Sequence, residues 1–279
     1  MTTGRPIDHI VLVVPDLTAA AATYRTLGFT LTPRARHGAH MGTSNHLAQL
    51  AGHSFIEILE VDRPDTLIDH DPAADPPVFS FGAQNRDVAR RGGGISMLVF
   101  ASDDARADIA RFGDAGIPTY APFDFERQTT LPDGTQKTVA FSLGFATSPD
   151  MPAIAFFVCQ NRWPENFWRP TFQDHANGAR NIAAVYLAAD DPARHGEFLG
   201  TLFAGEVTAV DGGVRVACGA DQEVLVLDRP YIQAIDPAAP VEVGGGPLFA
   251  GIAIEAAKAT PHVTPAAQAC GTFIEWRPT

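Results

Sequence analysis

The sequence predicts an α+β protein assembled from repeated β-α-β-β-β units. The first observation is size and composition: 279 residues, 46% of them hydrophobic and 19% charged, suit two packed domains of roughly 150 residues and carry too few charges for a disordered chain. The second observation is that three segments share one order of features. The third is that strand-length apolar runs follow these segments.

The three similar segments span residues 7–28, 95–116 and 181–205. Each opens with β-branched and apolar residues over the length of a strand and then reaches an aspartate, which we place at Asp16, Asp103 and Asp190. Aspartate is a favoured helix cap, and in each segment a stretch with helical spacing follows until a glycine ends it. The alternative is an unrelated α+β protein in which Asp-capped helices recur by coincidence.

Further strands are predicted between and after these segments. They cover residues 45–50, 55–61, 139–145, 154–160, 214–218 and 223–228. A fourth and shorter unit runs from 248–254 to 272–276, with its helix missing or replaced by the Pro-containing stretch 259–266. Residues 63–94, rich in Asp, Pro and Gly, and residues 161–178, rich in Trp, Pro and Asn, are predicted linkers, and a Gly-Gly-Gly-Pro break at 244–247 separates units three and four.

A more specific pattern begins at Asp8-His9 in the first predicted strand and continues with Glu57 inside Phe-Ile-Glu-Ile-Leu. Further matching motifs are Gly42-Thr-Ser-Asn45, Phe156-Phe-Val-Cys-Gln160, Trp163-Pro-Glu-Asn-Phe-Trp168 and His175-Ala-Asn-Gly178. With these motifs the chain resembles the vicinal-oxygen-chelate superfamily of glyoxalases, bleomycin-resistance proteins and extradiol dioxygenases, and within it the glyoxalase-like domain subgroup. The resemblance covers most of the chain and is strongest in residues 6–61 and 93–190.

The resemblance implies both a fold and a metal site. Two units of the superfamily curl into one cupped, mixed-sheet half-barrel, so we expect a glyoxalase-like domain over residues 1–162 and a second, truncated domain over residues 163–279. In the superfamily the opening strand often supplies a histidine ligand and the last strand of the unit a glutamate, and here these are His9 and Glu57. We therefore expect both to bind a divalent ion (Zn, Ni, Mn or Fe), with Glu57 as the catalytic residue.

These residue types suit metal chemistry. A neutral imidazole and a carboxylate on adjacent inward-facing strands offer a borderline and a hard donor to one cation. Open positions on that cation let two neighbouring substrate oxygens bind side by side, and the metal then polarises a carbonyl, stabilises an enediolate or, if it is iron, activates dioxygen. One residue of the pair can instead act as an acid or base without a metal.

The second unit departs from the superfamily pattern. Aligning Asp16 with Asp103 places Ser96 at the position of a second histidine ligand. Phe156 and Phe157 stand where a second carboxylate is expected. Half of the usual ligand set is therefore missing from the sequence.

Three histidines between His9 and Glu57 are candidates to complete the set, namely His37, His40 and His46. Strand alternation places His46 on the face opposite Asn45, so both cannot point into the cup. A histidine in a polar, Gly-rich loop is often only solvated, and the sequence leaves the choice among the three open.

Ordinary structural roles are the alternative for other residues. Glu57 itself can face solvent on a strand with one wet side. Glu275, in the similar motif Phe-Ile-Glu-Trp, has no histidine on its partner strand and is interpreted as structural. Arg127 and Lys137, on a predicted hairpin that turns at Pro132, are interpreted as solvated in preference to contacting an anionic substrate.

Charge and cysteine content argue against other classes of protein. A net charge of −12 disfavours binding to nucleic acid or to an anionic membrane surface. No apolar stretch approaches the roughly 20 residues needed to span a bilayer, and the first residues lack the pattern of a signal peptide. Cys159, Cys218 and Cys270 are far apart and odd in number, so we expect no disulfide framework and a cytoplasmic setting.

The leading hypothesis is a metal-assisted enzyme of the lyase, isomerase or oxygenase type that acts on a small oxygen-rich metabolite in the N-terminal cup. The alternative is a non-catalytic protein that sequesters a small molecule, as bleomycin-resistance proteins do, because an acidic chain attracts basic ligands. An iron-dependent ring-cleaving dioxygenase is a third hypothesis, which the lack of ligands in the C-terminal half disfavours. The expected partner is a small molecule, with a homodimer as a further expectation.

Overall fold

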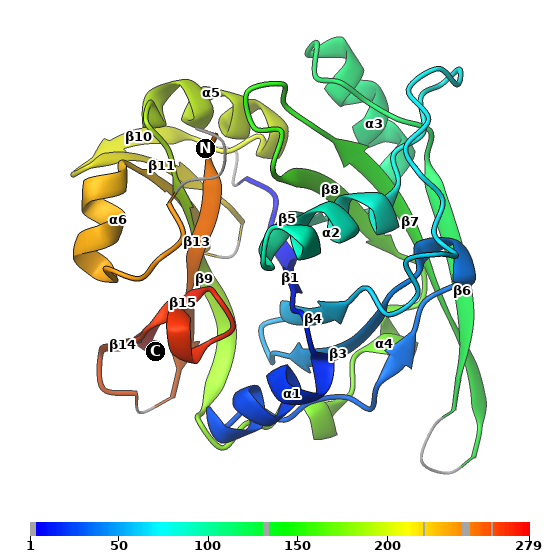
Figure 1. Cartoon of the computed structure of the whole chain (residues 1–279), viewed down its shortest axis with the longest axis horizontal. Helices are drawn as coiled ribbons and strands as arrows, with labels where there is room; N and C mark the ends of the chain where they lie inside the picture. The colour runs from blue at the N-terminus through cyan, green and yellow to red at the C-terminus, as the bar shows by residue number, and fades with distance from the viewer. Residues whose placement is uncertain (1–3, 131–133, 220, 242–245, 258) are drawn as a thin grey trace.

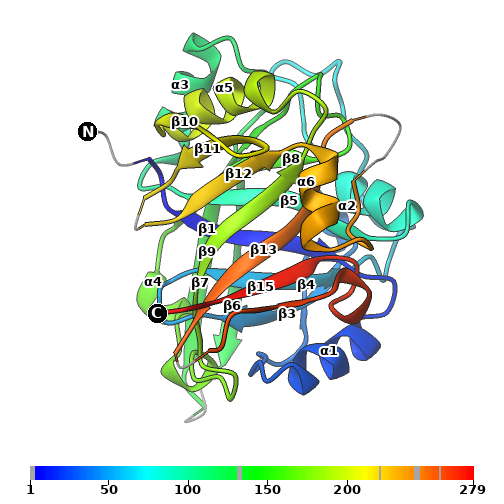
Figure 2. The same cartoon turned by 90° about the vertical axis from the view of Figure 1, so that its left-hand side faces the viewer.

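The computed structural model describes residues 4–130, 134–219, 221–241, 246–257 and 259–279. They form two mixed β-sheets that lie side by side, with helices along their edges and faces (Figures 1 and 2). The α+β class and the two mixed sheets predicted from the sequence are therefore confirmed. Within the described ranges, no helix is long and apolar enough to cross a membrane.

The first sheet has eight strands in the order β2-β3-β4-β1-β5-β8-β7-β6. The strands are β1 (Ile7–Val13), β2 (Ala35–Arg36), β3 (Ser44–Gln49), β4 (Phe55–Glu60), β5 (Gly94–Ala101), β6 (Phe123–Thr130), β7 (Gln136–Ala146) and β8 (Ala155–Asn161). Their helices are α1 (Leu17–Thr26), α2 (Phe81–Arg90), α3 (Ala105–Asp114) and α4 (Pro164–Phe167), with short 3-10 turns η1 (Ala39–Met41) and η2 (Pro170–Phe172).

The second sheet has seven strands in the order β10-β11-β12-β9-β13-β15-β14. The strands are β9 (Ala179–Ala188), β10 (Val207–Val210), β11 (Gly213–Ala217), β12 (Glu223–Leu227), β13 (Leu248–Ala256), β14 (His262–Thr264) and β15 (Phe273–Pro278). They are accompanied by α5 (Pro192–Phe203), α6 (Arg229–Ile235) and a short 3-10 turn η3 (Ala266–Gln268).

The chain order confirms the predicted repeat. Units one, two and three each run strand, helix, then three strands, as β1-α1-β2-β3-β4, β5-α3-β6-β7-β8 and β9-α5-β10-β11-β12. In the fourth unit, β13 to β15, the described residues between the first two strands form no α-helix. Units one and two meet where β1 pairs antiparallel with β5, and the sheet curls around this centre into a half-barrel (Figure 1). The predicted break at 244–247 lies partly outside the described residues.

The helix caps of units two and three differ by one residue from the prediction. Asp16 caps α1 as expected, with its carboxylate accepting from the backbone N–H of Thr18 at 2.8 Å. In units two and three the cap is the second aspartate of a pair, Asp104 in place of Asp103 and Asp191 in place of Asp190. Either residue of an Asp-Asp pair fits the capping pattern, and the caps predicted from the sequence, Asp103 and Asp190, were therefore wrong by one residue.

The two predicted linkers contain helices that the sequence analysis missed. Residues 63–94 include α2, whose N-terminus is capped by Ser80, the hydroxyl of which accepts from the backbone N–H of Ala83 at 3.0 Å. Residues 161–178 include α4 and η2. Helix α2 packs on the concave side of the first sheet, because Val88 belongs to the apolar cluster of that side and α2 lies in front of β5 (Figure 1).

The largest apolar core lies between the two sheets. Strand alternation directs Ile10 and Leu12 of β1 toward Val185 of β9 and Ile252 of β13, and α1, α3 and α5 add to the same cluster. The rings of Phe156 and Phe249 meet across this layer at 5.9 Å between their centroids. The other face of each sheet therefore points away from the centre of the molecule, and the concave face of the first sheet is free to hold a site.

Candidate functional site

The first sheet presents polar side chains to its concave face at one place. On β1 the residues facing the cup include His9 and Val11, and on β4 they include Phe55 and Glu57. Glu57 lies opposite Val11 of β1 on one side and Leu47 of β3 on the other. Since alternate residues of a strand share a face, the sequence positions of His9 and Glu57 bring both into the cup.

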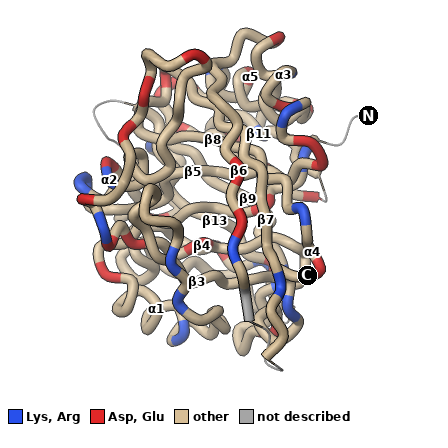
Figure 3. The backbone as a smooth tube through the Cα atoms, turned by 90° about the vertical axis from the view of Figure 1, so that its right-hand side faces the viewer, with Lys and Arg blue, Asp and Glu red and all other residues tan. Residues whose placement is uncertain are grey.

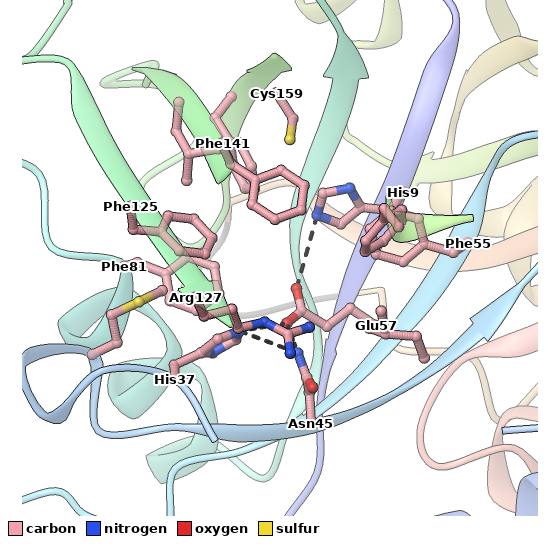
Figure 4. Close-up of a pocket in the computed structure, with 15 residues that line it drawn as sticks. His9, His37, Asn45, Phe55, Glu57, Phe81, Phe125, Arg127, Phe141 and Cys159 are labelled. Atoms are coloured by element: carbon pink, nitrogen blue, oxygen red, sulfur yellow. Dashed lines mark hydrogen bonds and ion pairs between the residues drawn. The ribbon is translucent and has the colours of Figure 1, made fainter. Parts of the chain in front are cut away.

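These residues line a pocket with about 510 Å³ of empty space, part of it open to solvent (Figure 4). Six phenylalanine rings make up the largest part of its wall. The lining residues are His9, His37, Met41, Asn45, Leu47, Phe55, Glu57, Phe81, Phe125, Arg127, Phe141, Leu143, Phe157, Cys159 and Phe167. Burial raises the pKa of the Cys159 thiol, so this side chain is neutral at physiological pH.

Glu57 is the centre of the polar cluster. Its residue surface is only 5% exposed, so the alternative that it faces solvent is wrong. Asn45 Nδ2 donates a hydrogen bond to Glu57 Oε1 at 2.6 Å. His9 Nε2 lies 3.8 Å from Glu57 Oε2, and His37 Nε2 lies 3.6 Å from Oε1. The two imidazoles therefore approach the carboxylate at different oxygens (Figure 4).

His9 is held in a single orientation. Its Nδ1 lies 2.5 Å from Asp8 Oδ1, which requires a proton on Nδ1 and leaves Nε2 directed to the pocket. The ring stacks on Phe55 with 4.1 Å between centroids and meets the edge of Phe157 at 5.4 Å. The partly buried carboxylate of Asp8 and two aromatic contacts thus fix the nitrogen that faces Glu57.

His37 is the histidine of the three candidates that reaches the pocket. Its Nδ1 lies 2.8 Å from Thr43 Oγ1, and its Nε2 lies 3.2 Å from Asn45 Nδ2. Burial lowers the pKa of His37, although the nearby charge of Glu57 opposes this effect. A neutral ring that donates from Nδ1 and accepts at Nε2 satisfies both contacts.

The other two candidate histidines lie elsewhere. His46 is directed to the opposite face of β3, as predicted, where its Nδ1 donates to the backbone oxygen of Thr32 at 2.7 Å. His40 lies beside Phe123, with 5.6 Å between ring centroids, and does not line the pocket. His37 lies in a loop, where no strand or helix periodicity indicates which side chains point into the pocket, so the sequence did not favour it over His40 and His46. Its contact with Thr43, in the Gly-Thr-Ser-Asn motif, is the feature that sets it apart.

Arg127 of β6 also lines the pocket, contrary to the interpretation of a fully solvated hairpin. Burial lowers the pKa of Arg127, and the negative charge of Glu57 opposes this effect. Strand pairing of β6 with β7 confirms the hairpin, while its predicted turn at Pro132 lies outside the described residues. Lys137 is exposed, as predicted, and does not line the pocket. Alternation on β6 was the available signal, since Phe125 and Arg127 share a face.

Comparison with known proteins gives the family. A family model described as a glyoxalase-like domain matches residues 7–203, which is most of the chain. The chain belongs to the glyoxalase-like domain family. The resemblance predicted from the motifs around His9 and Glu57 is thereby confirmed. None of the curated proteins compared with the sequence matches it.

Solved structures share the fold of this glyoxalase-like protein. A hypothetical protein from Staphylococcus aureus matches 98% of this chain with 99% of its own, at 15% identity and a TM-score of 0.71. The Mn(II)-bound glyoxalase from Novosphingobium aromaticivorans matches 100% of this chain with 83% of its own, at 12% identity and a TM-score of 0.55. At these identities the likeness establishes the two-sheet fold alone.

The second unit of the glyoxalase-like protein supplies no donor at the positions equivalent to His9 and Glu57. Because the true cap is Asp104, which follows Asp16 by 88 residues, the equivalent of His9 is Met97 and not Ser96. Ser96 lies at a register shift between β1 and β5, and its hydroxyl donates to Asn85 Oδ1 of α2 at 2.6 Å.

Phe157 takes the position of the second carboxylate. Phe157 pairs with Val99 on β5 as Glu57 pairs with Val11 on β1, and it lines the pocket. Its neighbour Phe156 belongs to the core between the sheets. The ring of Phe157 therefore closes the half of the pocket that lies opposite Glu57.

The donor set fits a divalent ion poorly. Within the described ranges, no group of three or more His, Cys, Asp or Glu side chains is arranged to hold a metal ion. His9 and Glu57 offer two donors, and Asp8 fixes His9 as a carboxylate often does for a metal-bound histidine. Catalytic zinc sites use three protein ligands, so these two residues do not by themselves build one. Metal binding by His9 and Glu57 stays a prediction.

The second sheet carries a separate polar cluster around Glu275. Tyr186 donates its hydroxyl to Glu275, and Arg277 Nε donates to the same carboxylate at 2.9 Å. Arg277 also donates to Glu223 at 3.0 Å. Each carboxylate in this cluster therefore forms an ion pair with an arginine, Glu275 with Arg277 and Glu223 with Arg277 and Arg215. This fits the structural role predicted for Glu275.

Proposed function

We propose that the first cup is the active site of an enzyme that moves a proton to or from a carbon atom of a small, oxygen-bearing metabolite. The reaction class is an isomerisation or a lyase reaction. The observation that carries the proposal is the 3.8 Å separation of His9 Nε2 and Glu57 Oε2 inside an apolar pocket. At this separation, both groups can contact one substrate atom, or two bonded atoms, at hydrogen-bonding distance.

Glu57 is the general base of this proposal. Asn45 holds Oε1, which leaves Oε2 directed at the substrate space beside His9. Glu57 removes a proton from the carbon next to a carbonyl group. His9, as an imidazolium, donates its Nε2–H to the carbonyl oxygen as negative charge develops there, and Asp8 balances the charge of the ring. Glu57 then returns its proton to the same or the adjacent carbon, and the oxygen that becomes the carbonyl gives a proton back to His9, so the isomerisation needs no co-reactant.

The test is hydrogen exchange into substrates. Native protein is incubated in D₂O with a panel of small hydroxy-ketones and 2-oxo acids, and deuterium at carbon is measured by NMR. We expect Glu57→Gln to lower the exchange rate about 100- to 10,000-fold, the usual contribution of a general base. Glu60→Gln, on the same strand but bonded to Arg34, is the matched control and should keep the native rate. Native exchange by Glu57→Gln would contradict the proposal.

Metal analysis of the same preparations tests the role of His9. In the proposed mechanism, His9→Ala loses proton donation while the metal content of the protein is unchanged. One equivalent of a divalent ion that disappears in His9→Ala would instead assign His9 as a metal ligand. In that case Glu57 binds the ion with it, as the superfamily resemblance implies.

A binding function without catalysis is the second candidate. It is favoured by the six phenylalanine rings that surround the buried carboxylate of Glu57, because aromatic faces and a carboxylate together bind organic cations. This function predicts micromolar binding of aromatic amines, lost in Glu57→Gln, in a protein that exchanges no substrate hydrogen. Titration calorimetry with aromatic amines on Glu57→Gln and Glu60→Gln, the two variants of the hydrogen-exchange test, decides between the candidates.

A further inference from the structure

A second cavity continues the aromatic pocket outward. It contains about 1110 Å³ of empty space, part of it open to solvent, and shares Asn45, Leu47, Arg127 and Phe167 with the inner pocket. The two cavities therefore form one cleft along the concave side of the first sheet. We name the outer part the arginine groove, because Arg34, Arg36, Arg127 and Arg169 all line it. Figure 3 views the molecule from this side and shows basic stretches on β6 and beside β3.

Local sequence places these arginines around the groove. Arg36 belongs to β2 at one edge of the sheet and Arg127 to β6 at the other edge. Arg169 follows α4, and its backbone N–H donates to Gln49 Oε1 at 3.1 Å. The amide nitrogen of Gln49 donates to the backbone oxygen of Phe167 at 2.9 Å, so one buried glutamine of β3 holds this segment over the cleft.

The arginines differ in how their charge is balanced. Arg34 is engaged by two carboxylates, Glu60 at 3.2 Å and Asp62 at 3.1 Å. Arg36 lies 4.0 Å from Asp62, which Arg34 and Arg63 contact more closely, and 65% of its side chain is exposed.

Arg127 on β6 and Arg169 after α4 line the same groove. Burial is the main cause that lowers the pKa of Arg127, the negative charge of Glu57 opposes it, and the positive charge of Arg169 has a smaller effect that lowers it further. Both guanidinium groups line the groove, and none of the described residues that line it is an Asp or Glu, which favours a bound anion. The chain as a whole carries a net charge of −12, so this groove is a local exception to the charge of the protein.

We propose that the arginine groove is an oxyanion subsite. The substrate of the inner pocket then has two parts: an apolar or aromatic body among the phenylalanine rings and a carboxylate or phosphate that Arg36, Arg127 and Arg169 bind outside. This inference rests on the proposed function, because it assigns a substrate class to the same cleft. Arginine suits both oxyanions, since its planar fork donates two parallel hydrogen bonds to either.

The test uses probes that differ only in the charged end. Binding of 6-phenylhexanoate, 6-phenylhexyl phosphate, 6-phenylhexanol and 6-phenylhexylamine is measured by titration calorimetry. We expect either oxyanion to bind more tightly than the alcohol, with binding that weakens as salt is added, and the amine to bind most weakly. The order of the two oxyanions identifies which one the groove prefers. Equal binding of the acid and the alcohol, or tighter binding of the amine, overturns the proposal.

Variants locate the oxyanion in the groove. We expect Arg127→Gln and Arg36→Gln each to weaken binding of the preferred oxyanion about 10- to 100-fold, the loss expected for a hydrogen bond to a charged group, and to leave the alcohol unaffected. Because Arg36 is exposed, its variant tests the groove even if Arg127→Gln fails to fold. Lys137→Gln, on the same hairpin but outside the cleft, is the control and should bind as the native protein does. Native affinity in both arginine variants contradicts the subsite.

The same titrations on Glu57→Gln separate this inference from the proposed function. Oxyanion binding that persists in Glu57→Gln and depends on Arg127 supports the subsite whether or not Glu57 is a base. Loss of hydrogen exchange without loss of oxyanion binding supports both proposals together. Native hydrogen exchange by Glu57→Gln, with arginine-dependent binding intact, contradicts the general base and keeps the subsite.

Discussion

Units one and two of the first sheet have the same order of elements and opposite chemistry. Unit one places His9 and Glu57 in the cup, and unit two places Met97 and Phe157 at the equivalent positions. Both pairs are buried, so the difference is one of polarity and not of exposure. The comparison teaches that a symmetric backbone does not require a symmetric site: one unit carries the polar groups, and the other carries an apolar wall of the same pocket.

The largest change expected from this comparison is a metal site created by Met97→His. Met97 lies opposite Val11 and His9 lies opposite Val99, so residues 97 and 9 are diagonal neighbours across β1 and β5 on the cup face. A histidine there adds a third donor to His9 and Glu57, which is the number of protein ligands in catalytic zinc sites. We expect one equivalent of Zn²⁺ to bind more tightly than to the native protein, measured by competition with a chelator. Unchanged affinity would show that the two units do not superpose at this position.

Removal of the apolar wall should lower stability strongly. Phe157 is 3% exposed and contacts the rings of His9 and Phe145. We expect Phe157→Ala to reduce the free energy of unfolding by about 3–5 kcal/mol, measured by urea denaturation, because a large cavity replaces the ring. Phe157→Leu is the conservative control and should lose much less. A loss under about 1 kcal/mol for the alanine variant would mean that the wall collapses to fill the gap.

A smaller effect is expected from pH at His37. Burial lowers the pKa of His37 below 6.5, so the unfolded chain takes up a proton at a higher pH than the folded chain does. The stability contributed by neutral His37 is complete above about pH 6.5 and is lost as the pH falls below it, by at most about 1.4 kcal/mol per pH unit. Urea denaturation of the native protein and His37→Gln on either side of this pH measures the difference. Parallel pH profiles of the two proteins would contradict it, since the two proteins differ only at residue 37.

The smallest effect is expected from Ser96→Ala. Its hydroxyl donates to Asn85 Oδ1 of α2 at 2.6 Å and lies 3.3 Å from the backbone oxygen of Val11. We expect the free energy of unfolding to fall by about 1 kcal/mol, measured by urea denaturation, with hydrogen exchange activity unchanged. A loss of activity comparable to that of Glu57→Gln would show that Ser96 contributes to the site.

Much of this arrangement was predictable from the sequence where periodicity applies. The repeated strand and helix order gave the fold, and alternation on β1 and β4 placed His9 and Glu57 in one cup. Position in a loop carries no such signal, which is why His37 could not be chosen over His40. Two adjacent aspartates satisfy the same capping rule, so Asp103 was preferred to Asp104 and the comparison of units shifted by one residue.

Helix α2 was missed for a different reason. It lies in a stretch rich in proline, aspartate and glycine, a composition that predicts a loop, and its cap at Ser80 is a short-range signal inside that stretch. The packing that stabilises it is long-range, since Gln84 donates to the backbone oxygen of Ala153 at 3.2 Å. No pattern within a single segment reveals such a contact.

The position of α2 between units one and two also bears on which molecules the cleft admits. Phe81, the first residue of α2, lines the inner pocket, yet the helix belongs to neither repeat. No residue of α2 takes part in the strand pairing of the sheet, so the side chain at position 81 can change without altering a strand register. We therefore expect the side chain at position 81 to set the size of the ligand that the inner pocket admits: a bulkier one should select shorter ligands and a smaller one longer ligands, with His9 and Glu57 in place.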